Sequence, residues 1–121
     1  MKVKSFYQAT VVALALVAAS KGAVADTVLI TGANSGIGLE FATQYAAKGW
    51  TVIATHRRTE TPQALADLSA HYKNVRVEKL DVTDVDNVTA LATRLRGVPI
   101  DVLINNAGVY NDRSQCSERQ R

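Results

Sequence analysis

A chain of 121 residues is long enough for one domain and no more. Its formal net charge of +3 comes from Lys2, Lys4 and Lys21, because the acidic and basic residues of the remaining sequence balance. That balance excludes the extended basic surface of a typical nucleic-acid-binding protein. Cys116 is the only cysteine, which excludes an intrachain disulfide and a multi-cysteine metal site, and we expect no metal centre.

Residues 1–25 have the layout of a signal peptide. Lys2 and Lys4 form a basic start, an apolar run follows over 9–19, and small residues occupy 23–25. The uncharged stretch is shorter than the roughly 20 residues of a membrane-spanning helix, so we expect no permanent span. We predict cleavage and a periplasmic or secreted protein. The alternatives are an uncleaved anchor or interfacial helix, or an ordinary N-terminal helix of a cytoplasmic protein.

Short apolar runs alternate with helical stripes through the rest of the chain, a pattern typical of an α/β fold with a parallel sheet. Right-handed crossovers predict a strand order of 3-2-1-4, with the fourth strand at an exposed edge through which copies of the chain could associate. In chain order we predict a strand at 27–31, a helix at 36–48, a strand at 51–55, a helix at 62–72, a strand at 75–80, a helix at 84–96 and a strand at 100–105.

Two of these helices have recognisable start signals. Pro62 suits a first helical position, because its missing N–H costs nothing there. Thr83 is predicted to cap the last helix, with Asp84 and Asp86 in the first turn near the positive helix end.

Glycines punctuate the turn at 31–38, which joins the first strand to the first helix. Gly32 would allow a sharp turn, while Gly36 and Gly38 would let backbone N–H groups approach a pyrophosphate at the helix N-terminus. The spacing G-x-x-x-G-x-G differs from the general dinucleotide fingerprint, so an ordinary glycine-rich turn is the alternative.

Three other residues of this turn are candidate ligand contacts. The side chains of Asn34 and Ser35 are expected to bind phosphate or to brace the turn. Ile37 is expected either beside one end of the bound dinucleotide or in the core.

Two further motifs follow later strands: Asp81-Val82 after the third, and Asn-Asn-Ala-Gly at 105–108 after the fourth. Together with the glycine turn at 31–38 they resemble the short-chain dehydrogenase/reductase family over residues 27–110. The resemblance implies a Rossmann-type doubly wound parallel sheet, incomplete here with four strands and three helices. It also implies a half-domain at 26–110 that binds NAD(P), in relatives that transfer hydride between the cofactor and a carbonyl or alcohol substrate.

The end of the second strand is where such folds read the adenosine ribose of the cofactor. Arg57 and Arg58 lie there, and between the end of the predicted strand and Glu60 there is no acidic residue. A guanidinium can bind a 2′-phosphate with two hydrogen bonds, so NADP(H) is preferred and NAD(H) remains possible. Arg57 is the first choice for this contact and Arg58 the second; solvated surface arginines are the alternative.

The resemblance also implies roles for the two later motifs. Asp81 and Val82 would contact the adenine ring, with the carboxylate accepting a hydrogen bond from its amino group. The second motif would brace the sheet and line the ribose through Asn105, Asn106, Ala107 and Gly108. Turns without a ligand are the alternative in both places.

Catalysis in the family depends on a Tyr-x-x-x-Lys pair, and this sequence lacks one. The residues four positions after its tyrosines are Val11, Gly49, Arg76 and Ser114. We therefore predict no catalytic residue in the chain and no turnover by it alone. A truncated oxidoreductase is preferred, with a non-catalytic dinucleotide-binding or redox-sensing module, or a non-functional fragment, as alternatives. The polar tail at 111–121 is predicted to be disordered.

Overall fold

The computed structural model describes residues 24–108. The predicted signal peptide, apart from its last two residues, and the predicted tail at 111–121 therefore lie outside the described residues. Within residues 24–108, no helix is long and apolar enough to cross a membrane.

Strands and helices alternate along the described chain, and the four strands are parallel in the order β3-β2-β1-β4. This arrangement confirms the predicted α/β class and strand order. The predicted bounds are one or two residues too long at most ends. The elements are β1 (Thr27–Ile30), α1 (Gly36–Ala47), β2 (Thr51–His56), α2 (Gln63–His71), β3 (Val75–Lys79), α3 (Val85–Arg94) and β4 (Val102–Ile104).

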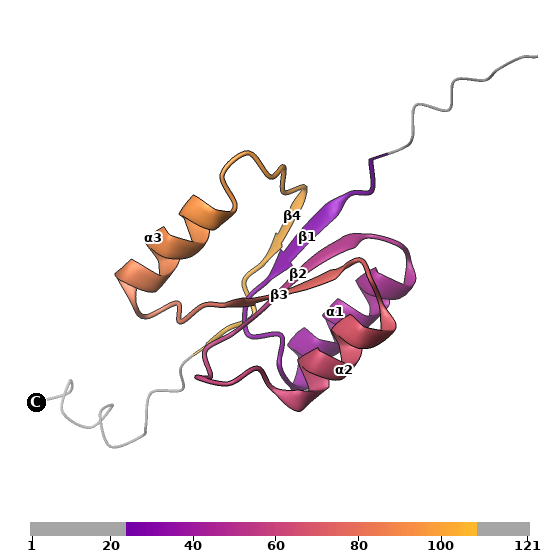
Figure 1. Ribbon diagram of the computed structural model, residues 1–121, viewed down its shortest axis with the longest axis horizontal. Helices are drawn as coiled ribbons and strands as arrows, with labels where there is room; N and C mark the ends of the chain where they lie inside the picture. Colours follow the sequence, from indigo (N-terminus) through magenta and orange to yellow (C-terminus); the bar gives the residue numbers. More distant parts are fainter. Residues whose placement is uncertain (1–23, 109–121) are drawn as a thin grey trace, which may run out of the picture.

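Apolar residues pack on both faces of the sheet, which is typical of a parallel sheet covered on two sides. Val28 and Ile30 of β1 join one core cluster with residues of α1 and α2. Ile53 of β2 belongs to a second cluster that includes Leu91 of α3. Figure 1 shows α1 and α2 together on one side of the sheet and α3 on the other.

The β4 edge is less completely covered than the centre of the sheet. Leu103 pairs with Leu29 of β1, and its side chain is 54% exposed. Among the described residues, β4 has no second neighbouring strand. An apolar, unpaired edge of this kind is a surface on which another strand can pair.

Asp84, rather than the predicted Thr83, caps α3. The Asp84 side chain accepts hydrogen bonds from the backbone N–H groups of Asp86 (2.9 Å) and Asn87 (3.2 Å). The Thr83 hydroxyl donates instead to Asp81 Oδ1. An aspartate is as good a cap as threonine, so a Thr-Asp pair leaves the exact helix start open in the sequence. Pro62 likewise lies one position before the first residue of α2.

His56 ends β2 as a buried titratable group. The residue is 4% exposed, and Nδ1 has no hydrogen-bond partner within the described part of the chain. Burial lowers the pKa of His56 below its usual value, and the Lys79 charge on the neighbouring strand lowers it further, against an opposing contribution from the backbone of Arg58.

We expect mild acid to destabilise the protein through His56. Below about pH 6.5 the unfolded state takes up a proton that the buried imidazole resists, so stability falls by up to about 1.4 kcal/mol per pH unit until the folded pKa is reached. Urea unfolding at pH 7.5 and 5.0 measures this loss. His56→Gln should reduce it, and His71→Gln, at an exposed histidine, should retain it. An unchanged loss in His56→Gln would contradict this assignment.

Candidate functional site

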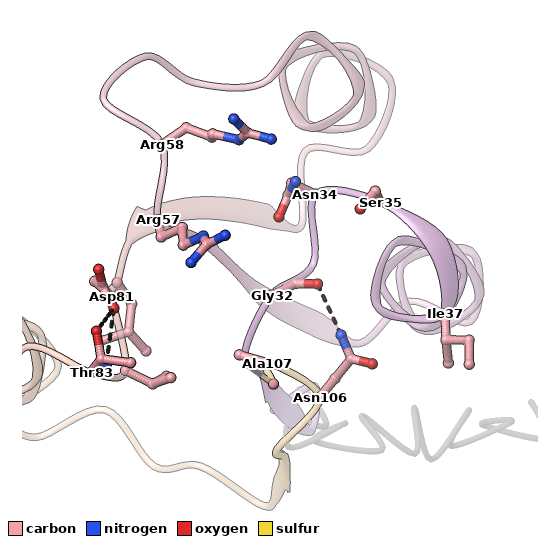
Figure 2. A pocket seen from close by; sticks show the side chains of 13 residues that line it. Gly32, Asn34, Ser35, Ile37, Arg57, Arg58, Asp81, Thr83, Asn106 and Ala107 are labelled. Carbon is pink, nitrogen blue, oxygen red and sulfur yellow. Dashed lines mark hydrogen bonds between the residues drawn. The ribbon is translucent and has the colours of Figure 1, made fainter. Parts of the chain in front are cut away.

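A pocket of about 420 Å³ lies at the carboxyl ends of the strands, where ligands bind in open parallel sheets. All four strands contribute to it through the segments that follow them (Figure 2). The lining residues are Gly32, Asn34, Ser35 and Ile37 after β1, Arg57 and Arg58 after β2, Leu80, Asp81, Val82 and Thr83 after β3, and Asn106, Ala107 and Gly108 after β4.

The glycine turn after β1 leaves the N-terminus of α1 open. Gly32 has φ +64°, and a Cβ there would lie 3.0 Å from Ala107 Cα, so both its conformation and its surroundings favour glycine. Ser35 is the N-cap residue, but its side chain makes no capping hydrogen bond, and the first turn of α1 contains no acidic residue. The positive end of this helix is therefore available to an anion.

Hydrogen bonds from Thr31 and Asn106 fasten this turn to the end of β4. The Thr31 hydroxyl accepts from the backbone N–H groups of Asn106 and Ala107, each at 3.0 Å. The Asn106 side-chain amide donates to the carbonyl oxygens of Gly32 (2.9 Å) and Thr31 (3.2 Å). Figure 2 shows the bond between Asn106 and Gly32. The segments after β1 and β4 thus form one wall of the pocket.

Gly38 is needed for this wall to close. It lies in the first turn of α1 and is buried. A Cβ at this position would collide with the carbonyl oxygen of Gly32 and would lie 2.5 Å from Asn106 Nδ2. Only a residue without a side chain lets α1 approach the turn this closely.

Two arginines supply positive charge at the opposite wall. Arg57 and Arg58 follow β2, are exposed, and extend over the pocket (Figure 2). In residues 24–108 the salt bridges join Arg76 and Arg94 to Glu78, so neither pocket arginine is paired with a carboxylate. Their guanidinium groups are free to bind an anion.

Asp81 adds an ionised carboxylate beside these arginines. Its Oδ1 atom accepts from the Thr83 hydroxyl (2.6 Å) and from the Thr83 backbone N–H (2.9 Å). These two bonds, the hydroxyl first, lower the pKa of Asp81 below its usual value, and the charges of Arg57 and Lys79 lower it further. The pocket therefore combines two cations and one fixed anion.

The model of the family described as short chain dehydrogenase matches residues 26–120. The chain belongs to the short-chain dehydrogenase/reductase family. Members of this family bind nicotinamide dinucleotides. The resemblance predicted from the three motifs is thereby confirmed.

Curated relatives in this family match the same part of the chain. Serine 3-dehydrogenase from Rhizobium radiobacter is 40% identical over 92 residues, which cover 71% of this chain and 34% of the relative. (−)-Isopiperitenone reductase from Mentha piperita is 39% identical over 88 residues, which cover 67% of this chain and 28% of the relative. The match thus spans about a third of the length of these relatives.

Solved structures of short-chain dehydrogenases agree with the fold. A short-chain dehydrogenase from Streptomyces avermitilis has a TM-score of 0.64 at 42% identity, with 72% of this chain and 32% of that one covered. A family member from Burkholderia multivorans with bound NADP has a TM-score of 0.67 at 36% identity, covering 72% of this chain and 38% of that one.

Most of the residues predicted to bind cofactor line the pocket together. The exceptions are Gly36, Gly38 and Asn105. Gly38 does not line the pocket but packs against Gly32 and Asn106, which do. Asn105 is exposed outside the pocket. Ile37 is 70% exposed, so the alternative that placed it in the core is wrong.

Leu80 and Thr83 line the pocket but are not among the predicted site residues. Both flank the Asp81-Val82 pair directly, and that adjacency is the signal in the sequence that could have found them. Because Thr83 also suits a helix cap, its sequence position alone does not predict that it binds the Asp81 carboxylate. Within residues 24–108, no group of acidic, histidine or cysteine side chains could hold a metal ion.

Gly38→Ala should disrupt the wall of the pocket. The added methyl group meets the Gly32 carbonyl and the Asn106 amide, and such overpacking costs about 1–3 kcal/mol of unfolding free energy. Chemical denaturation measures the loss. Gly108→Ala is the matched control, because a Cβ there meets nothing within 4 Å. Equal stability of the two variants would contradict the close approach at Gly38.

Proposed function

We propose that this chain is the cofactor-binding part of an NADP(H)-dependent oxidoreductase that interconverts a carbonyl compound and an alcohol. The observation that carries the proposal is the pocket itself, in which an uncapped helix N-terminus faces two arginines without a carboxylate partner among residues 24–108. Family membership supports the dinucleotide, and the arginines support the 2′-phosphate.

The pyrophosphate of the cofactor fits the glycine turn. Backbone N–H groups at the start of α1 lack a capping side chain, and the Ser35 hydroxyl is free to bind the same anion. The absence of a side chain at Gly38 keeps the turn and α1 in contact, which holds these donors at the floor of the pocket.

The adenosine end of the cofactor fits the wall formed after β2 and β3. Arg57 and Arg58 would bind the 2′-phosphate of NADP(H), and each could donate two hydrogen bonds from its planar guanidinium. Asp81 and Val82 would contact the adenine ring. NAD(H) would make the same contacts without the phosphate, so we propose weaker binding of NAD(H) rather than exclusion.

The nicotinamide end would lie between Ile37 and the segment after β4. Ile37 offers an exposed apolar side chain, and Asn106, Ala107 and Gly108 present small or polar groups to the ribose. When bound, the nicotinamide supplies or accepts a hydride at C4. The residues of this chain bind and orient that ring.

The substrate is proposed only as a carbonyl compound or an alcohol. The names of the two curated relatives give different substrates, serine in one and (−)-isopiperitenone in the other. Among residues 24–108, no tyrosine lines the pocket, and we propose that the lining residues serve to bind the cofactor. Export through residues 1–25 and association through the β4 edge stay predictions.

Replacement of both pocket arginines should change cofactor selectivity. We expect Arg57→Ala/Arg58→Ala to weaken NADPH binding by about tenfold for each guanidinium that binds the phosphate, because charge-assisted hydrogen bonds contribute about 1.5–3 kcal/mol. NADH binding should change by less than about twofold, since NADH lacks the phosphate. Titration of the full chain with each nucleotide, followed by calorimetry or nucleotide fluorescence, measures both affinities.

Arg96→Ala is the matched control, because Arg96 is an exposed arginine that does not line the pocket. It should leave both affinities unchanged. Equal losses of NADPH and NADH binding in the double variant would overturn the assignment of the phosphate site. Failure of the wild-type chain to bind either nucleotide would overturn the proposed function itself.

A further inference from the structure

We propose that Thr83 is a positioning residue for cofactor selectivity: it holds the Asp81 carboxylate still, so that Arg57 stays free for the 2′-phosphate. The inference rests on the proposed function and deepens it. It concerns a residue that does not itself need to touch the phosphate. Its basis is the arrangement of three side chains from two neighbouring strand ends of the pocket.

Thr83 fastens one carboxylate oxygen with two donors. Its hydroxyl and its backbone N–H both donate to Asp81 Oδ1, at 2.6 and 2.9 Å. Figure 2 shows both bonds on the side of the pocket below Arg57. The hydroxyl bond is the shorter, and hydrogen bonds to a charged group are stronger than those between neutral groups. Both bonds end on the ionised carboxylate, so loss of the hydroxyl would leave Oδ1 held by the Thr83 backbone N–H alone.

Arg57 lies close enough to sense this carboxylate without being paired with it. The Arg57 charge contributes to the lowered pKa of Asp81, yet no nitrogen of Arg57 lies within salt-bridge distance of Asp81. The other charged group that acts on Asp81 is Lys79 of β3. Asp81 is thus an ionised neighbour of Arg57 that does not form an ion pair with it.

An unrestrained aspartate would compete with the cofactor phosphate. A carboxylate and a phosphate bind a guanidinium through the same planar pair of donors, so an Arg57–Asp81 ion pair would occupy the donors that the 2′-phosphate requires. Thr83 prevents this competition by keeping Oδ1 directed at its own hydroxyl and N–H. NADH binding does not use those donors, and any change in the proposed adenine contact of Asp81 would affect both cofactors alike, so capture of Arg57 should lower the affinity for NADPH relative to that for NADH.

The test is the ratio of the two cofactor affinities in the full chain. Thr83→Val keeps the shape of the side chain and the backbone bond but removes the hydroxyl, and we expect about fivefold weaker NADPH binding with NADH binding changed by less than about twofold. Thr83→Ser restores the hydroxyl and should restore the wild-type ratio. Thr89→Val, at an exposed threonine of α3 outside the pocket, should leave both affinities unchanged.

A double-mutant cycle separates this role from a structural one. In an Asp81→Asn background there is no carboxylate to restrain, so Thr83→Val should no longer change the NADPH to NADH ratio. Persistence of the effect in that background would overturn the proposal. So would an equal loss of NADPH and NADH binding in Thr83→Val, which is what a general weakening of the turn before α3 would produce.

A measurement without nucleotide keeps the two proposals distinguishable. In the full chain, the NMR resonance of the Arg57 side-chain Nε–H should respond more strongly to titration of Asp81 in Thr83→Val than in the wild type, because the freed carboxylate approaches the guanidinium. An identical response would overturn the role of Thr83. If the wild-type chain binds neither nucleotide, the proposed function fails, and this response still decides the role of Thr83.

Discussion

The site depends on the hydrogen bonds that tie the end of β1 to the end of β4. Parallel strands share no hairpin, so nothing in the local chain joins these ends. Thr31 and Asn106 make the connection through one hydroxyl and one amide, which satisfy two backbone N–H groups and two carbonyl oxygens. The glycine turn is thereby fixed from both sides, and the orientation of the donors at the start of α1 follows from it.

The fold was predictable because its signals are local and redundant. The apolar runs Val28–Ile30 of β1 and Val52–Ala54 of β2 are buried or half-buried on both faces, so each of these two strands contains an uninterrupted apolar run. Strand order then follows from crossover handedness, which the sequence does not need to encode. The glycine turn, the Asp81-Val82 pair and the motif at 105–108 were enough to predict most of the lining residues of the pocket. Each of them follows a strand, and the carboxyl ends of parallel strands meet at one edge of the sheet.

The hydrogen-bond partners and burial of individual side chains were harder to predict than the fold. Thr83 and Asp84 are adjacent and chemically equivalent as helix caps, so the sequence does not show which residue caps α3 and which one holds Asp81. The burial of His56, whose Nδ1 atom has no hydrogen-bond partner among residues 24–108, was similarly hard to predict, because histidine is intermediate between typically buried and typically exposed residues. Both features depend on which direction a side chain takes in a packed structure.

The two ends of the pocket are built by different physical means. The end proposed to bind the pyrophosphate is made of backbone groups held by hydrogen bonds between strand ends and by the close approach at Gly38, so it tolerates little change in sequence. The end proposed to bind the adenosine is lined by side chains on the segments after β2 and β3, and Arg57 and Arg58 there are exposed. Among residues 24–108, neither arginine is in a salt bridge. Under the proposed function, affinity for a dinucleotide and selectivity between dinucleotides are therefore separable in this fold. Substitutions after β2 and β3 would alter the preferred cofactor, while the glycine turn proposed to bind the pyrophosphate would stay intact.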